Sequence, residues 1–174
     1  FVAAEGEGSY LVHNKMTYGN PTGEDITTYY VGSLYEEANG SARYHIFLGD
    51  MQIASISENE VTYYYRDHLR GTNVTTDADG NLKELIEYKP YGEFARREMY
   101  GDGADVAWFY FTGKPKDDET GLYYYGARYY DPALGRFITA DTIVQNPSGD
   151  PETFNRYSYC GGNPIARVDP SGHF

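Results

Sequence analysis

The sequence has one cysteine, few basic residues and no apolar stretch long enough to cross a bilayer. A single cysteine, Cys160, excludes an internal disulfide and a cysteine-based metal cluster. The 14 Lys and Arg residues stand against 26 Asp and Glu, so the formal net charge is −12. This balance argues against nucleic acid as a partner and against an anionic membrane surface, since both require a basic footprint.

Histidines are equally sparse, and they are scattered without metal-ligand spacing at His13, His45, His68 and His173. We therefore expect no metal and no other cofactor. The sequence begins with Phe1 rather than Met, and we expect either a processed product or an excised part of a longer, exported protein, with the export signal upstream.

Tyrosine and glycine are abundant instead, with 20 residues of each among the 174. Tyrosine suits half-buried sheet faces, and glycine marks tight turns, so the composition predicts short strands joined by turns. The segment Arg43–Leu48, followed by Gly49-Asp50 and then Met51–Ile56, is typical of a β-hairpin. The candidate strands are Tyr10–His13, Ile26–Val31, Ala42–Leu48, Gln52–Ser57, Val61–Arg66, Leu82–Tyr88 and Trp108–Thr112. Short helices are expected within Glu93–Met99 and Glu152–Tyr157.

The last fifty residues carry an ordered series of Tyr, Gly, Asp-Pro and Asn-Pro motifs. They comprise Arg128, Asp131-Pro132, Gly135-Arg136-Phe137, Asp141, Asn163-Pro164 and Asp169-Pro170-Ser171-Gly172. This series resembles the RHS repeat-associated core domain that closes RHS/YD-repeat proteins, including polymorphic toxins and the shell-forming component of Tc toxins. Residues Val61–Gly92 are similar to the YD hairpin that precedes this core.

The resemblance implies an all-β fold, in which an antiparallel YD-repeat sheet coils into a shell and ends in an inward-folded plug. It divides the chain into a terminal segment at 1–9, YD-repeat-like hairpins at 10–107 and the core domain at 108–174. It also implies partners within one precursor, namely an upstream repeat shell and a downstream effector such as a toxin. The expected location is secreted or at the cell surface.

In the resembling family this segment cuts its own chain by aspartyl chemistry. Such chemistry needs two carboxylates close together, one to activate a water and one to polarise the scissile carbonyl. The resemblance assigns these roles to Asp141 and Asp169, with Arg128 beside them, and it places the cut after Phe174. If active, the chain would be an intramolecular protease with a single turnover.

Two features depart from the family pattern. Relatives often end this motif in Gly-Leu, whereas here Gly172 is followed by His173 and Phe174, which adds one residue. The segment between Asp141 and Arg156 is also longer than the common spacing.

Each candidate residue also has a purely structural interpretation. An Asp before Pro commonly forms a turn, which fits Asp169-Pro170 and is the interpretation we adopt for Asp131-Pro132. Asp141 is compatible with a capping role, and Arg128 with stacking between tyrosines. Cys160 lacks any activating neighbour in the sequence and is expected to be a buried, inert thiol.

Two other classes of function remain open. One is a structural YD-repeat module without catalysis, which self-associates through exposed sheet edges. The other is a glycan- or receptor-binding surface formed by the tyrosines.

Overall fold

The computed structural model describes residues 14–19, 25–32, 34–38, 40–58, 60–100, 107–117, 120–143 and 154–174. The chain forms two compact units, Phe1–Tyr63 with Asp77–Gly80, and Tyr64–Thr76 with Asn81–Phe174. Strand pairs in both units are antiparallel, and the described residues contain no α-helix. The predicted all-β fold is therefore confirmed.

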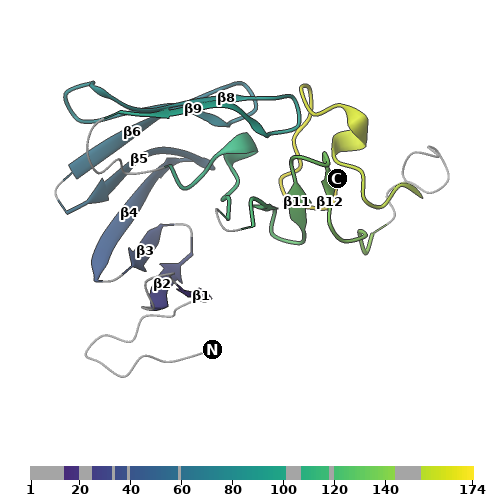
Figure 1. Ribbon diagram of the computed structural model, residues 1–174, viewed down its shortest axis with the longest axis horizontal. Helices are drawn as coiled ribbons and strands as arrows, with labels where there is room; N and C mark the ends of the chain where they lie inside the picture. Colours follow the sequence, from purple (N-terminus) through teal and green to yellow (C-terminus); the bar gives the residue numbers. More distant parts are fainter. Residues whose placement is uncertain are drawn as a thin grey trace. The chain divides into compact units, whose positions relative to one another are not determined.

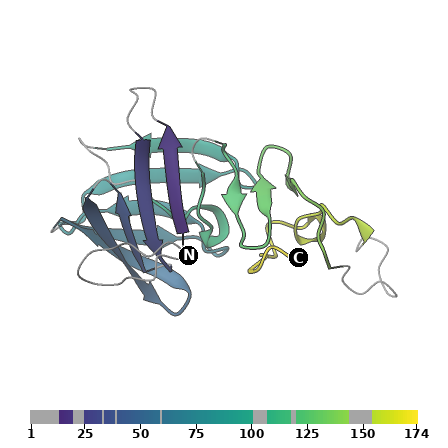
Figure 2. The same ribbon diagram turned by 90° about the horizontal axis from the view of Figure 1, so that it is seen from below.

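The first unit is a series of hairpins in which strands adjacent in the chain are adjacent in the sheet (Figure 1). Figure 2 shows its first hairpin as two neighbouring dark purple arrows. The predicted turn at Gly49-Asp50 is confirmed, because Leu48 pairs with Met51 across it and Gly49 has a φ of +66°. The strands of the first unit are β1 (Asn14–Gly19), β2 (Asp25–Val31), β3 (Tyr35–Ala38), β4 (Ser41–Leu48), β5 (Met51–Ser57) and the first part of β6 (Glu60–Arg66).

The second unit begins within β6 and continues with β7 (Thr72–Thr76), β8 (Leu82–Tyr88) and β9 (Phe94–Met99), again in chain order. The elements that follow are much shorter. They are the 3-10 turn η1 (Phe111–Gly113), the three-stranded sheet of β10 (Tyr123–Tyr124), β11 (Tyr129–Asp131) and β12 (Arg136–Phe137), and the turn η3 (Cys160–Gly162).

Two expected elements are wrong. The helix expected within Glu93–Met99 is strand β9, which pairs with β8, and the buried carboxylate of Glu84 holds Arg97 at 2.7 Å. The strand expected at Trp108–Thr112 is reduced to an isolated bridge between Phe109 and Pro115, and turn η1 follows from Phe111, because Thr112 has a φ of +52°. The expected strand Tyr10–His13 lies outside the described residues, as does the start of the expected helix Glu152–Tyr157.

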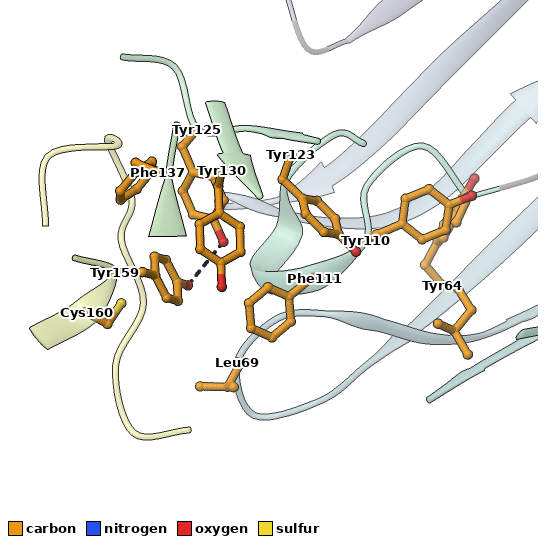
Figure 3. Close-up of a cluster of buried hydrophobic side chains, with 12 residues drawn as sticks. Tyr64, Leu69, Tyr110, Phe111, Tyr123, Tyr125, Tyr130, Phe137, Tyr159 and Cys160 are labelled. Atoms are coloured by element: carbon orange, nitrogen blue, oxygen red, sulfur yellow. Dashed lines mark hydrogen bonds between the residues drawn. The ribbon is translucent and has the colours of Figure 1, made fainter. Parts of the chain in front are cut away.

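A cluster of buried aromatic rings supports this region of short elements (Figure 3). The rings of Tyr130 and Tyr159 lie 4.5 Å apart, and Phe137 meets Tyr125 edge to face at 5.6 Å. Burial of each ring stabilises the unit by roughly 2 kcal/mol, and favourable ring pairs add to this. The fully buried rings are Tyr110, Phe111, Tyr123, Tyr125, Tyr130, Phe137 and Tyr159.

The tyrosine hydroxyls of the cluster are hydrogen-bonded, as buried polar groups must be. Tyr123 donates to the carbonyl of Gly92 at 2.9 Å, and Tyr130 donates to the carbonyl of Tyr91 at 2.8 Å. The hydroxyl of Tyr125 donates to that of Tyr159 at 3.1 Å, the dashed line in Figure 3. The rings therefore form a rigid base for the polar residues beside them.

Candidate active site

Arg128 lies at the end of the turn between β10 and β11. The turn is closed by a hydrogen bond from the N–H of Tyr125 to the carbonyl of Arg128 at 3.0 Å. Arg128 precedes Tyr130 by two residues, and both side chains are buried, as expected for positions on one side of an extended chain. Its guanidinium carbon lies 3.6 Å from the centre of the Phe137 ring, so the aromatic cluster fixes the plane of the cation.

The guanidinium of Arg128 joins three segments that are far apart in the sequence. Its Nη2 lies 3.0 Å from Oδ2 of Asp141 and 3.8 Å from Oδ2 of Asp169. Its Nη1 donates to the carbonyl of Arg156 at 2.8 Å, and its Nε donates to the carbonyl of Gly172. Burial lowers the pKa of Arg128, and the two carboxylates oppose that shift, so the group remains a cation.

Both predicted aspartates therefore meet at one nitrogen of Arg128. Because both distances end at the same atom, the two carboxylate oxygens cannot be farther apart than the two distances together. The guanidinium of Arg128 is therefore the group that both carboxylates face. Asp141 is 5% exposed and Asp169 is 0% exposed, so water screens the pair weakly.

Asp141 follows β12, and both oxygens of its carboxylate have partners. Its Oδ1 accepts the N–H of Ile143 at 2.9 Å and lies 2.8 Å from Nδ1 of His173. Burial alone would raise the pKa of Asp141, but the bonds from Ile143 and His173 and the charge of Arg128 outweigh it, so the pKa is lowered. Asp141 is therefore ionised at neutral pH and able to accept a proton.

Asp169 organises the last residues of the chain around its carboxylate. Its Oδ1 accepts the N–H groups of Ser171 at 3.0 Å, Gly172 at 2.7 Å and His173 at 3.2 Å. Its Oδ2 accepts the N–H of Phe174 at 2.6 Å. The carboxylate of Asp169 therefore shapes this turn, as expected for an Asp before Pro, and it also faces Arg128.

Other contacts attach this C-terminal turn, residues 169–174, to the rest of the unit. Lys114 donates from Nζ to the carbonyl of Pro170 at 2.6 Å, and Ala127 donates its N–H to the carbonyl of Ser171 at 3.2 Å. Gly172 has a φ of +82°, and a Cβ there would lie 2.9 Å from the carbonyl oxygen of Tyr125. Glycine is therefore required at this position both by backbone conformation and by space.

Cys160 contacts the C-terminal turn through its backbone N–H rather than through its thiol. Its N–H donates to the Phe174 O atom at 3.1 Å, and its φ of +51° is uncommon for a residue with a side chain. The thiol is fully buried, and burial raises its pKa to about 11, so it is a poor nucleophile.

The remaining motif residues lie in turns around the site. Asp131 accepts the N–H groups of Ala133 and Leu134 between β11 and β12. Pro132 is part of this turn, and Gly135 has a φ of +66°. Asn163 donates its N–H to the carbonyl of Cys160, and the adjacent Pro164 is buried, whereas Pro170 is exposed in the C-terminal turn.

Four residues that the sequence analysis did not assign to the site also contribute. They are His173, Arg156, Lys114 and Cys160 through its N–H. The extra residue after Gly172 was the one signal in the sequence that drew attention to His173. In the described part of the chain no cluster of His, Cys, Asp and Glu is suited to hold a metal ion, and no helix there could cross a membrane.

Several known proteins are similar to this chain in sequence. A family model described as Teneurin YD-shell matches residues 29–165. Salivary gland surface protein 1 of Aedes aegypti is 31% identical over 99% of this chain and 4% of its own length. Toxin subunit YenC1 of Yersinia entomophaga is 35% identical over 70% of this chain and 12% of its own length. The chain thus spans a small part of these relatives.

Solved structures share the fold. The crystal structure of TcdB2-TccC3-Cdc42 matches 85% of this chain and 8% of that chain, with a TM-score of 0.69 and 25% identity. The crystal structure of TcdB2-TccC3-TEV matches the same share of this chain with a TM-score of 0.68 and 26% identity. The matched family model, these relatives and these structures agree, and the chain belongs to the RHS/YD-repeat shell family described as Teneurin YD-shell.

Proposed function

We propose that this chain is the closing segment of a YD shell and that it cuts its own polypeptide after Phe174. The cut separates the shell from a downstream effector held inside it. One observation carries the proposal: Asp169 accepts the N–H of Phe174 at 2.6 Å, and the same Arg128 nitrogen lies near both Asp169 and Asp141. The proposed scissile residue is therefore tied to the predicted pair of carboxylates.

The names of several relatives support an effector as the partner. Beside toxin subunit YenC1, they include the tRNA3(Ser)-specific nuclease WapA of Bacillus spizizenii and double-stranded DNA deaminase toxin A of Burkholderia cenocepacia. This chain corresponds to 7% and 8% of the latter two. We infer that the region matched by this chain occurs in proteins with different effector activities. We also infer that the precursor of this chain is exported or displayed at a cell surface.

The proposed reaction is hydrolysis of one peptide bond. Ionised Asp141 accepts a proton from a water molecule, and the water oxygen bonds to the carbonyl carbon of Phe174. The carbon–nitrogen bond then breaks, and the nitrogen of the following residue takes up the proton. Asp169 holds Phe174 in place, and Arg128 orients both carboxylates and balances their charge.

The developing negative charge on the carbonyl oxygen needs a donor. In the described chain the Phe174 O atom belongs to the terminal carboxylate, and it stands for the carbonyl oxygen of an extended chain. The N–H of Cys160 lies 3.1 Å from it. A donor held rigidly at this position would stabilise the oxyanion, as in other acyl-transfer sites.

Cleavage within one chain places modest demands on the catalytic groups. The C-terminal turn is held by hydrogen bonds from Arg128, Ala127 and Lys114, so the bond to be cut stays at the site. Such pre-positioning replaces a bimolecular encounter and lowers the entropic part of the barrier. The same contacts would keep the cut end docked after the reaction.

The test is intact mass spectrometry of a precursor that extends beyond Phe174. We expect the parent to lose its extension after Phe174, and the Asp141→Asn and Asp169→Asn variants to remain uncut. Asp131→Asn is the matched control, because Asp131 also organises a turn, and it should be cut like the parent. An uncut parent, or cutting that persists in both site variants, would leave the chain as a non-catalytic shell segment.

A further inference from the structure

His173 contacts both carboxylates of the candidate site. Its Nδ1 lies 2.8 Å from Oδ1 of Asp141, and its backbone N–H donates to Oδ1 of Asp169. An ionised carboxylate only accepts hydrogen bonds, so the proton of this contact is carried by Nδ1. His173 thus connects the residue that would activate water with the turn that carries Phe174.

We propose that His173 is a positioning residue of the cleavage, supplied by the strand that is cut, and that it acts through Asp141. The inference rests on the proposed function. In this arrangement the substrate strand completes the site that cuts it, so the site is fully formed once residues 169–174 have docked.

The geometry of Asp141 explains how His173 would act. Oδ1 of Asp141 is occupied by His173 and by the N–H of Ile143, and Oδ2 faces Arg128. With Oδ1 held, the carboxylate cannot rotate freely, and Oδ2 stays directed to Arg128, which Asp169 also faces. A catalytic group performs best when its own supporting contacts fix its orientation.

His173 also influences the proton affinity of this carboxylate. It is among the groups that lower the pKa of Asp141 against the effect of burial. Loss of the imidazole should therefore raise that pKa. If Asp141 must be ionised to act as a base, the acid limb of the cleavage rate should move to higher pH.

Other charged groups lie near Asp141 and limit the size of this effect. Arg128 contacts its carboxylate from the β10–β11 turn, and Arg156 donates to its backbone carbonyl from the segment before η3. Asp169 of the C-terminal segment shares Arg128 with it, whereas Lys114 and Arg167 contact Pro170 and the Phe174 ring. Because most are cations, Asp141 should still ionise without His173, and the acid limb should shift rather than disappear.

The experiment measures single-turnover cleavage of the extended precursor across pH. His173→Leu removes the polar contact, whereas the amide of His173→Asn can donate from about the position of Nδ1. We expect the Leu variant to be slower by roughly ten- to a hundredfold, as misplacement of a reacting group typically causes, with its acid limb shifted upward. The Asn variant should recover most of the rate. His68→Leu is the control, since His68 contacts a backbone carbonyl at Ile165.

A second readout does not depend on cleavage. Carboxyl carbon NMR of the 174-residue chain should show the titration of Asp141 moving to higher pH in His173→Leu and not in His68→Leu. A Leu variant that is cut at the parent rate with the parent pH profile would overturn the role of His173 alone. Equal slowing of the Leu and Asn variants would reduce His173 to a structural contact and also overturn it. An uncut parent would overturn the proposed function and this role together.

Discussion

The guanidinium of Arg128 stacks on the ring of Phe137, with its central carbon 3.6 Å from the ring centre. This stacking requires a planar cation, and the same plane directs the Arg128 donors to Asp141 and to the carbonyls of Arg156 and Gly172. A lysine at this position keeps the charge but has neither the plane nor the fixed set of donors.

Arg128→Lys should therefore lose both stability and cleavage. Buried acceptors left without donors cost about 1–3 kcal/mol, which thermal unfolding would detect as a lower midpoint. Cleavage of the extended precursor should fall severely, because the two aspartates lose their common partner. Arg136→Lys is the matched control at an exposed position in β12, and it should behave like the parent. Equal cleavage by the two variants would contradict a role for the guanidinium geometry.

Gly172→Ala should undock the C-terminal turn. Any Cβ at this position would meet the carbonyl oxygen of Tyr125 at 2.9 Å and two backbone nitrogens at 3.2 Å. Gly121→Ala is the control that separates backbone strain from steric overlap. Gly121 also has a positive φ, +74°, but a Cβ added there would have no atom within 4 Å. The control should cost about 1–2 kcal/mol for the left-handed backbone alone.

The Gly172 variant should be destabilised by more than this control and should lose cleavage. Thermal unfolding and mass spectrometry of the two variants measure these effects. If both variants unfold at the same temperature and are cut equally, the close packing of Gly172 has no consequence.

The strands that the sequence predicts correctly are those bounded by strong turn residues. Ala42–Leu48 and Gln52–Ser57 match β4 and β5 within one residue at each end, because Gly49-Asp50 fixes the register between them. Strand β9 was missed because Arg, Glu and Met favour helices. Its pairing with β8 and the contact of Arg97 with buried Glu84 outweigh that local preference.

Only part of the candidate site could be predicted from the sequence. Arg128, Asp141 and Asp169 could be named from the order of motifs, and they meet at one guanidinium. The contact between His173 and Asp141 spans 32 residues of sequence and depends on how the C-terminal turn docks. The N–H of Cys160 likewise gains its position from a backbone conformation that no side-chain pattern reveals.

Replacing the N–H of Cys160 with an ester oxygen should slow cleavage by about 10²–10³, the typical effect of losing one oxyanion donor. The exchange is made by incorporating an α-hydroxy acid at position 160, which keeps the side chain but weakens the Tyr159 carbonyl as an acceptor of the Gly162 N–H. The same exchange at Gly162 is the control, because its N–H donates to the carbonyl of Tyr159 within the same turn. Cys160→Ala should retain the parent rate, since the buried thiol takes no part. Equal rates for the two esters would exclude the N–H of Cys160 as an oxyanion donor.

Asp141 should make the second unit less stable in acid. Its folded pKa lies below the ordinary aspartate value of 3.8, so its contribution to stability is fully present above that value and is lost as pH falls through the folded pKa. The unfolding free energy of the parent should therefore exceed that of Asp141→Asn most at neutral pH, and the difference should shrink on acidification. His173→Leu should lie between them, because it removes one of the contacts that lower the pKa. Denaturant unfolding at a series of pH values measures the three curves, and parallel curves would show that the contacts of Asp141 do not favour its ionised form.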